Sequence, residues 1–194
     1  MNYCSACAAP VEFRIPEGDN MPRHVCGSCN TIHYTNPKIV VGCIPEWGDT
    51  ILLCRRAIEP RYGYWTLPAG FLEDYETTIE GAARETREEA LADVDISELY
   101  TLINLPQINQ VYVMFRGSLR ERKFGAGEES LDVRLCREED IPWDEIAFPV
   151  VEQTLKLYFR DRRRGRFGTY TGDITRPADK WRDYQVRFLN GNGG

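Results

Sequence analysis

Short runs of apolar residues, bounded by turn-forming residues, predict a series of β-strands. The runs occur at residues 39–44, 51–54, 64–67, 100–105, 110–119 and 131–135. The first two flank a turn at residues 46–49, and this arrangement predicts a β-hairpin. The run at 64–67 is stopped by Pro68-Ala69-Gly70.

Two segments follow the period of a helix instead. Residues 77–92 place four small or apolar residues on one face and charged residues on the opposite face; the four are Ile79, Ala83, Thr86 and Ala90. A second helix is expected at residues 150–162. Strands mixed with helices in this way predict an α+β fold, an α/β/α sandwich in which helices cover both faces of a mixed sheet.

Three regions are expected along the chain. Residues 1–36 contain too few large apolar residues for a core of their own, and Asn36-Pro37 marks a boundary because proline favours an extended predecessor. Residues 37–165 form the main domain. Residues 166–194, which end in Asn-Gly-Asn-Gly-Gly, are expected to be a loosely structured tail.

Composition indicates one soluble globular domain with a small appendage. Of 194 residues, 42% are apolar and 28% are charged, a balance typical of folded soluble proteins. The net charge of -6 argues against nucleic acid as the main partner. No apolar run approaches the roughly 20 residues of a membrane helix, and residues 1–4 do not resemble a secretory signal, so we expect a cytoplasmic protein without membrane contact.

Four cysteines are paired in two CxxC motifs, Cys4/Cys7 and Cys26/Cys29, separated by 18 residues. This spacing is typical of a structural zinc ribbon, in which the metal replaces a hydrophobic core. Four thiolates already close such a site, so His24 and His33 are expected to be bystanders. The remaining cysteines lie in apolar stretches and are interpreted as buried structural thiols: Cys43, Cys54 and Cys136.

Three carboxylates stand at positions i, i+3 and i+4 of the first predicted helix: Glu85, Glu88 and Glu89. On a helix these side chains share one face, where they repel each other unless cations compensate. Oxygen ligands suit Mg²⁺ or Mn²⁺, which proteins often share with substrate phosphates. The alternative is a solvated acidic face without a function.

The segment around these acids resembles the Nudix box, the signature of Nudix hydrolases. Six of the seven fixed letters match in register: Gly70, Glu76, Arg84, Glu85, Glu88 and Glu89. The resemblance implies that Glu85, Glu88 and Glu89 ligate the metal, that Arg84 positions a carboxylate, that Glu76 braces the loop and that Gly70 permits the turn. Leu91 replaces the family's glycine, and Thr86 and Ala92 replace aliphatic residues. Because leucine resists the left-handed conformation, we expect an altered helix end.

The general base is not fixed by this motif. Three carboxylates are candidates for it, Glu73, Glu128 and Glu129, with a solvated loop residue as the alternative for each. Glu129 lies in a Gly-Glu-Glu-Ser-Leu-Asp segment that we expect to fold over the substrate.

The combination of CxxC pairs, the box and the segment Leu105–Val113 is similar to plant-type FAD and ADP-ribose pyrophosphatases over residues 3–170. NADH pyrophosphatases resemble the chain more distantly, because their Ser-Gln-Pro-Trp-Pro-Phe-Pro array is absent. The similarity implies cleavage of FAD to FMN and AMP, or of ADP-ribose, by a homodimer. Aromatic residues are candidates for ring binding, or for the core: Tyr62, Tyr64, Trp65, Tyr112 and Phe115.

Two rival interpretations stay open. The chain could act on NADH, capped RNA or nucleoside triphosphates instead. It could also be a non-catalytic ligand sensor whose ribbon binds nucleic acid, assisted by the arginine-rich stretch at residues 160–166. The intact set of acids argues against a sensor.

Overall fold

The structure is a computed structural model that describes residues 1–176 and 184–189. The chain divides into two compact units, Met1–Pro37 and Lys38–Gly194. No helix in the described ranges is long and apolar enough to cross a membrane.

The smaller unit is a three-stranded antiparallel sheet in the order β1-β2-β3. Its strands are β1 (Val11–Arg14), β2 (Arg23–Cys26) and β3 (Ile32–His33). Its buried hydrophobic residues in the structure are Cys4, Val25 and Cys26, whereas Tyr3, Phe13 and Tyr34 are exposed. So small a core agrees with a unit stabilised by something other than apolar packing.

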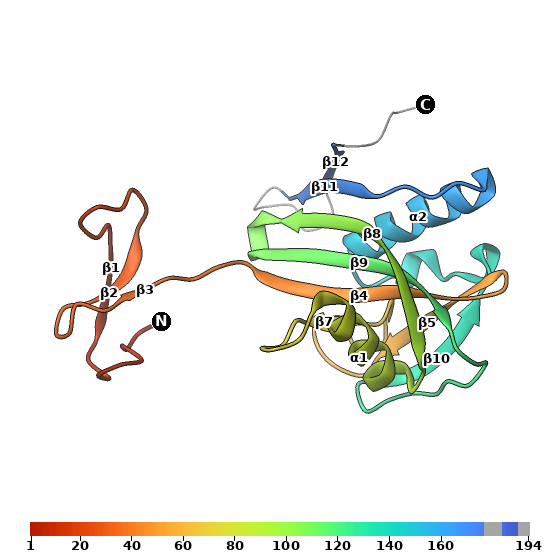
Figure 1. Cartoon of the computed structure of the whole chain (residues 1–194), viewed down its shortest axis with the longest axis horizontal. Helices are drawn as coiled ribbons and strands as arrows, with labels where there is room; N and C mark the ends of the chain where they lie inside the picture. The colour runs from red at the N-terminus through yellow and green to blue at the C-terminus, as the bar shows by residue number, and fades with distance from the viewer. Residues whose placement is uncertain (177–183, 190–194) are drawn as a thin grey trace. The chain divides into compact units, whose positions relative to one another are not determined.

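The larger unit contains a nine-stranded mixed sheet, in which β10-β5-β4-β9-β8-β11-β12 is the main order, β6 pairs with β5, and β7 pairs with β4 (Figure 1). Two neighbouring pairs, β4 with β9 and β8 with β11, are parallel. The strands are β4 (Lys38–Trp47), β5 (Thr50–Arg56), β6 (Trp65–Thr66), β7 (Ala69–Phe71), β8 (Val94–Leu105), β9 (Gln110–Leu119), β10 (Ser130–Cys136), β11 (Tyr170–Thr175) and β12 (Gln185–Phe188).

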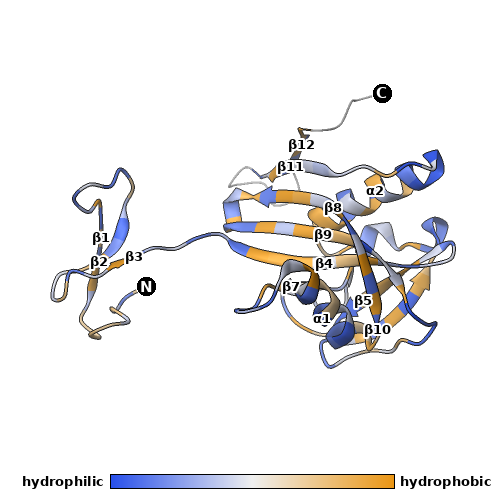
Figure 2. Cartoon of the chain, in the orientation of Figure 1, coloured by the Kyte–Doolittle hydropathy of each residue, from blue (hydrophilic) through white to orange (hydrophobic). Residues whose placement is uncertain are grey.

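Two long helices cover opposite faces of this sheet. They are α1 (Thr78–Ala90) and α2 (Pro149–Arg164), and three short 3-10 helices occur at Pro106–Ile108, Glu138–Asp140 and Trp143–Glu145. Strand β4 shows the division, because its side chains alternate between the two faces. Val40 and Ile44 belong to the core cluster that contains the α2 residues, whereas Val41 and Cys43 pack with Ala82 of α1. Hydrophobic residues accordingly concentrate in the central strands (Figure 2).

Helix α1 begins with a capping box. The Thr77 side chain accepts a hydrogen bond from the backbone N–H of Glu80, and the Glu80 carboxylate accepts one from the backbone N–H of Thr77. These reciprocal bonds satisfy two donors that a helix start leaves unpaired. The Glu-rich face is therefore anchored from the first turn.

The expectation of an altered helix end at Leu91 was wrong. Leu91 adopts the left-handed conformation, with φ 48° and ψ 36°, and ends the helix in the place of a glycine. The loop between β9 and β10 stabilises this helix end, because the N–H groups of Gly125 and Gly127 donate to the carbonyl oxygens of Ala90 and Glu89 at 2.9 and 3.0 Å. Carbonyls that a helix end leaves unpaired are thus satisfied by a distant segment.

The buried face of α1 contains the predicted Thr86 and Ala90, both 0% exposed, and two acids besides. Ile79, which was predicted on this face, is 49% exposed, whereas Glu85 and Glu89 are buried, at 8% and 7% exposure. The buried face is therefore partly acidic, unlike that of an ordinary amphipathic helix.

The prediction of a loosely structured tail from residue 166 was wrong for the described part of that segment. Strand β11 joins the sheet parallel to β8, and β12 pairs with β11. Ile174 is 1% exposed within the main core. The polar sequence of β11, Tyr-Thr-Gly-Asp-Ile-Thr, concealed a strand whose pairing comes from a distant segment. Residues 190–194, the glycine-rich end, lie outside the described residues.

Candidate functional site

The larger unit has a cavity of about 1240 Å³ next to α1. Its lining includes four charged residues of the predicted box helix, Arg84, Glu85, Glu88 and Glu89, and also Gly70 and Glu73. The structure therefore brings most of the predicted catalytic set to one cavity. Glu76 acts from outside the lining, through Arg84.

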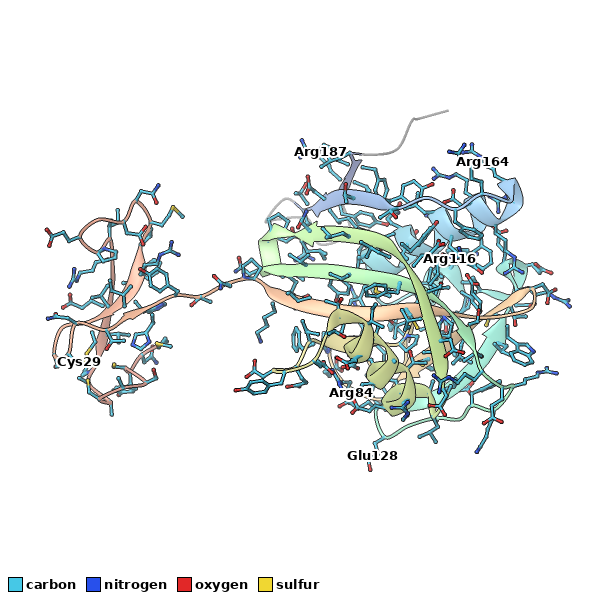
Figure 3. All side chains as sticks on the ribbon, viewed as in Figure 1. Cys29, Arg84, Arg116, Glu128, Arg164 and Arg187 are labelled. Atoms are coloured by element: carbon cyan, nitrogen blue, oxygen red, sulfur yellow. The ribbon has the colours of Figure 1, made fainter. Side chains whose placement is uncertain are left out.

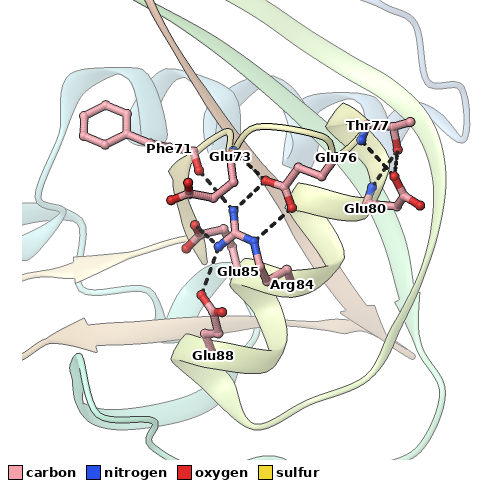
Figure 4. A network of polar contacts seen from close by, with 8 residues as sticks. All are labelled: Phe71, Glu73, Glu76, Thr77, Glu80, Arg84, Glu85 and Glu88. Carbon is pink, nitrogen blue, oxygen red and sulfur yellow. Dashed lines mark hydrogen bonds and ion pairs between the residues drawn. The ribbon is translucent and has the colours of Figure 1, made fainter. Parts of the chain in front are cut away.

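Arg84 is the centre of a polar network (Figure 4). Its Nε and Nη2 atoms donate to the two carboxylate oxygens of Glu76 at 3.0 and 2.7 Å. Its Nη1 donates to Glu85 at 2.7 Å and to Glu88 at 2.9 Å, and Nη2 also donates to the carbonyl oxygen of Phe71. One guanidinium thus orients two box carboxylates and ties the helix to the loop before it.

Glu76 braces that loop. Its carboxylate also accepts a hydrogen bond from the backbone N–H of Glu73 at 2.7 Å. The bonds from Arg84 lower the pKa of Glu76 to about 2, so the carboxylate stays charged. Gly81 allows the close approach, because a Cβ there would lie 2.8 Å from Glu76 Oε1.

Glu85 and Glu89 are buried acids with raised pKa values. Burial is the main cause for both, and for Glu89 the negative charge of Glu85 adds to it, which raises the pKa of Glu89 to about 8. Glu89 accepts a long hydrogen bond from the backbone N–H of Ala69 at 3.4 Å. The protein alone therefore leaves a negative site short of positive charge.

Two glycines allow backbone to pass close to these acids. A Cβ on Gly70 would overlap the Glu85 carboxylate, and a Cβ on Gly127 would overlap the carbonyl of Glu88. The requirement at Gly70 is thus lack of a side chain rather than an unusual backbone angle.

The chemistry of this donor set fits a hard divalent cation. The acids offer only oxygen ligands, and Mg²⁺ takes one or two carboxylates while it keeps several waters. Among the described residues the four ribbon cysteines form the tight ligand cluster, and the α1 acids are not drawn together to that degree because Nη1 of Arg84 stands between Glu85 and Glu88. The acids are therefore suited to a hydrated ion held from one side.

The predicted base candidates all line the cavity. Glu73 lies between β7 and α1, and Glu128 and Glu129 lie in the loop before β10. Glu128 is labelled on this loop in Figure 3. That loop is anchored twice, because the carbonyl oxygen of Glu129 accepts from the N–H of Ala57 at 2.8 Å and Gly127 binds the end of α1. The charge of Glu129 contributes to the raised pKa of both Glu85 and Glu89.

The predicted aromatic candidates separate into three groups. Tyr112 lines the cavity from β9, whereas Tyr62 and Tyr64 do not line it and are exposed. Trp65 and Phe115 are buried in the core, as the alternative interpretation expected.

Sequence reasoning missed other residues of the lining, among them Arg56, Phe148 and Tyr184. Arg56 is only 9% exposed, donates to the carbonyl oxygen of Pro60 at 2.9 Å and lies over the Phe148 ring at 5.1 Å. An arginine at the end of an apolar strand was the available signal for it. Phe148 and Tyr184 are far away in sequence, and no local pattern marks them.

The four predicted zinc ligands form one cluster in the smaller unit. The Sγ atoms of Cys4, Cys7, Cys26 and Cys29 all lie within 4.8 Å of one another, with contacts of 3.6 Å between Cys4 and Cys29 and 3.5 Å between Cys7 and Cys26. A zinc tetrahedron with bonds of about 2.3 Å needs sulfur separations of roughly 3.8 Å, so the residues fit the metal. His33 is not part of this cluster, but its Nε2 lies 3.3 Å from Cys4 Sγ and can orient that ligand.

The three other cysteines are buried, at 0% exposure for Cys43 and Cys136 and 1% for Cys54. Burial raises the pKa of Cys43 to about 12, and its Sγ contacts Thr86 Oγ1 at 3.2 Å. Such thiols stay protonated and serve packing.

Comparison with known proteins agrees with both units. Residues 2–35 match the family described as Nudix N-terminal, and residues 36–154 match the NUDIX domain. A NUDIX hydrolase structure from Nitrosomonas europaea is 53% identical, has a TM-score of 0.88, and is matched over 91% of this chain and 100% of its own.

Two curated relatives carry names of activities. The NAD-capped RNA hydrolase NudC of Stutzerimonas stutzeri (strain A1501) is 31% identical over 84% of this chain, which spans 58% of that relative's length. The ADP-ribose pyrophosphatase of Methanocaldococcus jannaschii is 27% identical over 66% of this chain, and the match covers 76% of that relative's length. With a family match over residues 36–154, an acid-bearing α1 and a four-cysteine unit, the chain belongs to the Nudix hydrolase family with an N-terminal zinc ribbon.

Proposed function

We propose that this protein is a pyrophosphatase that uses Mg²⁺ or Mn²⁺ to hydrolyse the diphosphate linkage of a dinucleotide or nucleoside diphosphate derivative. The observation that carries the proposal is the group of acids oriented by Arg84 at the wall of a large cavity. Two of these acids have raised pKa values, so a divalent ion would relieve a charge imbalance that the fold itself creates.

Each residue has a defined part in this proposal. Glu85, Glu88 and Glu89 would hold the metal, which when bound neutralises phosphate charge and activates water. Arg84 and Glu76 keep the acids in place through the hydrogen bonds described above. Glu129, which lines the same cavity as Glu85 and Glu89 from an anchored loop, is the favoured base, with Glu73 and Glu128 as alternatives.

The preferred substrate within the proposal is FAD, cleaved to FMN and AMP, followed by ADP-ribose. The size of the cavity, about 1240 Å³, and its aromatic residue Tyr112 support a bulky substrate with a ring. The relative from Methanocaldococcus jannaschii, named an ADP-ribose pyrophosphatase, supports the second substrate.

An NAD-linked diphosphate, free or as an RNA cap, is the second candidate. It is favoured by the 31% identity to a protein named as an NAD-capped RNA hydrolase. The chain spans little more than half of that relative, and its net charge of -6 does not favour extended contact with RNA.

A substrate screen with product identification tests the proposal. Purified protein is incubated with FAD, ADP-ribose, NADH and NAD-capped RNA, each with Mg²⁺, with Mn²⁺ or with a chelator. We expect metal-dependent release of a nucleoside monophosphate from at least one of them. Absence of release from all four would remove the proposed activity. Release from capped RNA alone would favour the second candidate.

The zinc ribbon is proposed to be structural, since four thiolates leave no open coordination position. A homodimer and a cytoplasmic location stay predictions, which sedimentation and cell fractionation would test.

A further inference from the structure

We propose that the hairpin β11–β12 forms the far wall of the substrate cavity, and that Tyr184 is the specificity-determining residue that contacts the planar ring of a nucleotide. The inference rests on the proposed function, because it names the part of the substrate that this wall recognises. It concerns residues beyond the part of the chain that matches the NUDIX domain, which ends at residue 154.

The floor of the cavity is a row of residues that crosses the sheet. Val40 on β4 is the register partner of Tyr112 on β9, and Tyr112 is the partner of Ile103 on β8. Alternate residues of a strand share a face, so Leu105 lies on the same face as Ile103. Val40, Tyr112 and Leu105 all line the cavity.

The row continues into the hairpin. Ile103 is the partner of Gly172 on β11, so Ile174, two residues further, shares that face. Ile174 is the partner of Val186, and Tyr184 stands two positions before Val186. Ile174 and Tyr184 both line the cavity. From β4 to β11 the row crosses three strand spacings, about 14 Å in all.

The two ends of this row differ in chemistry. The acids of α1 lie at the β4 end, because β7 pairs with β4 and leads into that helix. The hairpin lies at the opposite end of the row, where Ile174, Arg176 and Tyr184 line the cavity. A substrate whose diphosphate is at the acids therefore extends its other half towards Tyr184.

The hairpin is fixed firmly enough to shape a site. Gly172 lies so close to β12 that a Cβ there would meet the carbonyl oxygen of Arg187 at 2.5 Å and Phe188 at 2.8 Å. Asp173 accepts hydrogen bonds from Asn104 of β8 and from Arg187 of β12. The hairpin is thus tied to the sheet by side chains as well as by its backbone.

Tyr184 is held in a defined position. Its hydroxyl donates to Glu152 Oε2 of α2 at 2.8 Å, and its ring packs against the main core cluster. Phe148, at the start of the same helix, also lines the cavity, with Arg56 over its ring. Aromatic faces with a nearby guanidinium suit a planar heterocycle, which stacks on the ring.

Direct binding of substrate halves to the full zinc-loaded chain tests the proposal. Calorimetry with Mg²⁺ present measures the Kd of AMP, FMN and ribose 5-phosphate for the wild type and for Tyr184→Ala, Tyr184→Leu and Tyr184→Phe. We expect the Ala and Leu variants to bind at least one of AMP and FMN about tenfold more weakly or worse, with ribose 5-phosphate unchanged. The Phe variant, which keeps the ring, should bind like the wild type.

Gln185→Ala is the matched control, because Gln185 is an exposed residue of β12 next to Tyr184 but is not part of the lining. It should leave all three Kd values unchanged. The proposal is overturned if Tyr184→Leu binds every ligand like the wild type, if it loses ribose 5-phosphate equally, or if the wild type binds neither AMP nor FMN. A selective loss of ring binding in a protein without hydrolytic activity would sink the proposed function and leave the wall intact.

Discussion

Arg84 donates two hydrogen bonds to Glu76, from Nε at 3.0 Å and from Nη2 at 2.7 Å, and the same guanidinium reaches Glu85 and Glu88 with Nη1. One side chain therefore holds both the loop before α1 and the acids Glu85 and Glu88 of that helix. If this pair is broken, the acids lose their orientation while the helix keeps its own cap at Thr77.

Glu76→Gln is expected to reduce kcat by about 10- to 100-fold, the usual cost of losing a partner that orients metal ligands. Unfolding of the variant and of the wild type should also be followed against pH. Arg84 lowers the pKa of Glu76 to about 2, so the charged form stabilises the fold above its ordinary pKa of 4.5. That contribution is lost as the pH falls through about 2, and the variant should lack this part of the acid destabilisation. An unchanged kcat would contradict the positioning role.

Metal binding is expected to release the proton of the Glu89 carboxyl. Burial and Glu85 raise its pKa to about 8, so the metal-free protein carries a proton there at neutral pH. Because the pKa of Glu89 in the folded state is raised, the contribution of this carboxyl to the stability of the metal-free fold is greatest below pH 4.5. That contribution is lost as the pH rises towards 8. Mn²⁺ binding should therefore release protons at pH 7 and strengthen up to about pH 8.

Calorimetry in buffers of different ionisation enthalpy measures these protons. Glu89→Gln is the control, because it cannot titrate. Equal proton release from the variant and the wild type would show that the proton belongs to another group.

Two glycines in one loop offer a matched pair of substitutions. A Cβ on Gly127 would overlap the carbonyl of Glu88, whereas a Cβ on Gly125 would meet Leu91 Cδ1 at an ordinary 3.6 Å. Gly127→Ala should destabilise the protein by roughly 1–3 kcal/mol, the usual cost of overpacking. Because about 1 kcal/mol shifts Tm by roughly 2–4 °C at this chain length, calorimetric melting resolves the effect. Gly125→Ala should melt like the wild type, and equal Tm values for both variants would contradict the close packing of this loop.

The ribbon should depend on zinc. Its few buried apolar residues cannot supply a core, so the bound metal is expected to supply the folding energy of this unit. We expect one zinc per chain by atomic absorption, and loss of that zinc in Cys26→Ser. Cys54→Ser, a buried cysteine of the larger unit, is the control and should keep its zinc. Full zinc content after Cys26→Ser would exclude the four-cysteine site.

The elements closest to a local pattern were predicted well from the sequence. The run at 110–119 has the same bounds as β9, and the helices expected at 77–92 and 150–162 correspond to α1 and α2 within two residues at each end. The i, i+3, i+4 spacing of the acids is itself a local property, and so is the Thr77–Glu80 capping box. These features required no knowledge of distant contacts.

The remaining features depend on distant contacts. Leu91 takes the left-handed conformation where Gly125 and Gly127 satisfy the helix end, and β11 is a strand because β8 pairs with it. The sequence pattern placed Glu85 and Glu89 on the charged face of the helix, but both are buried where the helix lines the cavity. The far wall at Tyr184 likewise exists only once the hairpin has joined the sheet.

Anomalous diffraction at the manganese edge, from crystals grown with Mn²⁺, would locate the metal that we propose the acids of α1 hold. We expect at least one anomalous peak within bonding distance, about 2.0–2.3 Å, of a carboxylate oxygen of Glu85, Glu88 or Glu89, facing the cavity. Peaks confined to other acids of the surface, with these three carboxylates unbound, would contradict it.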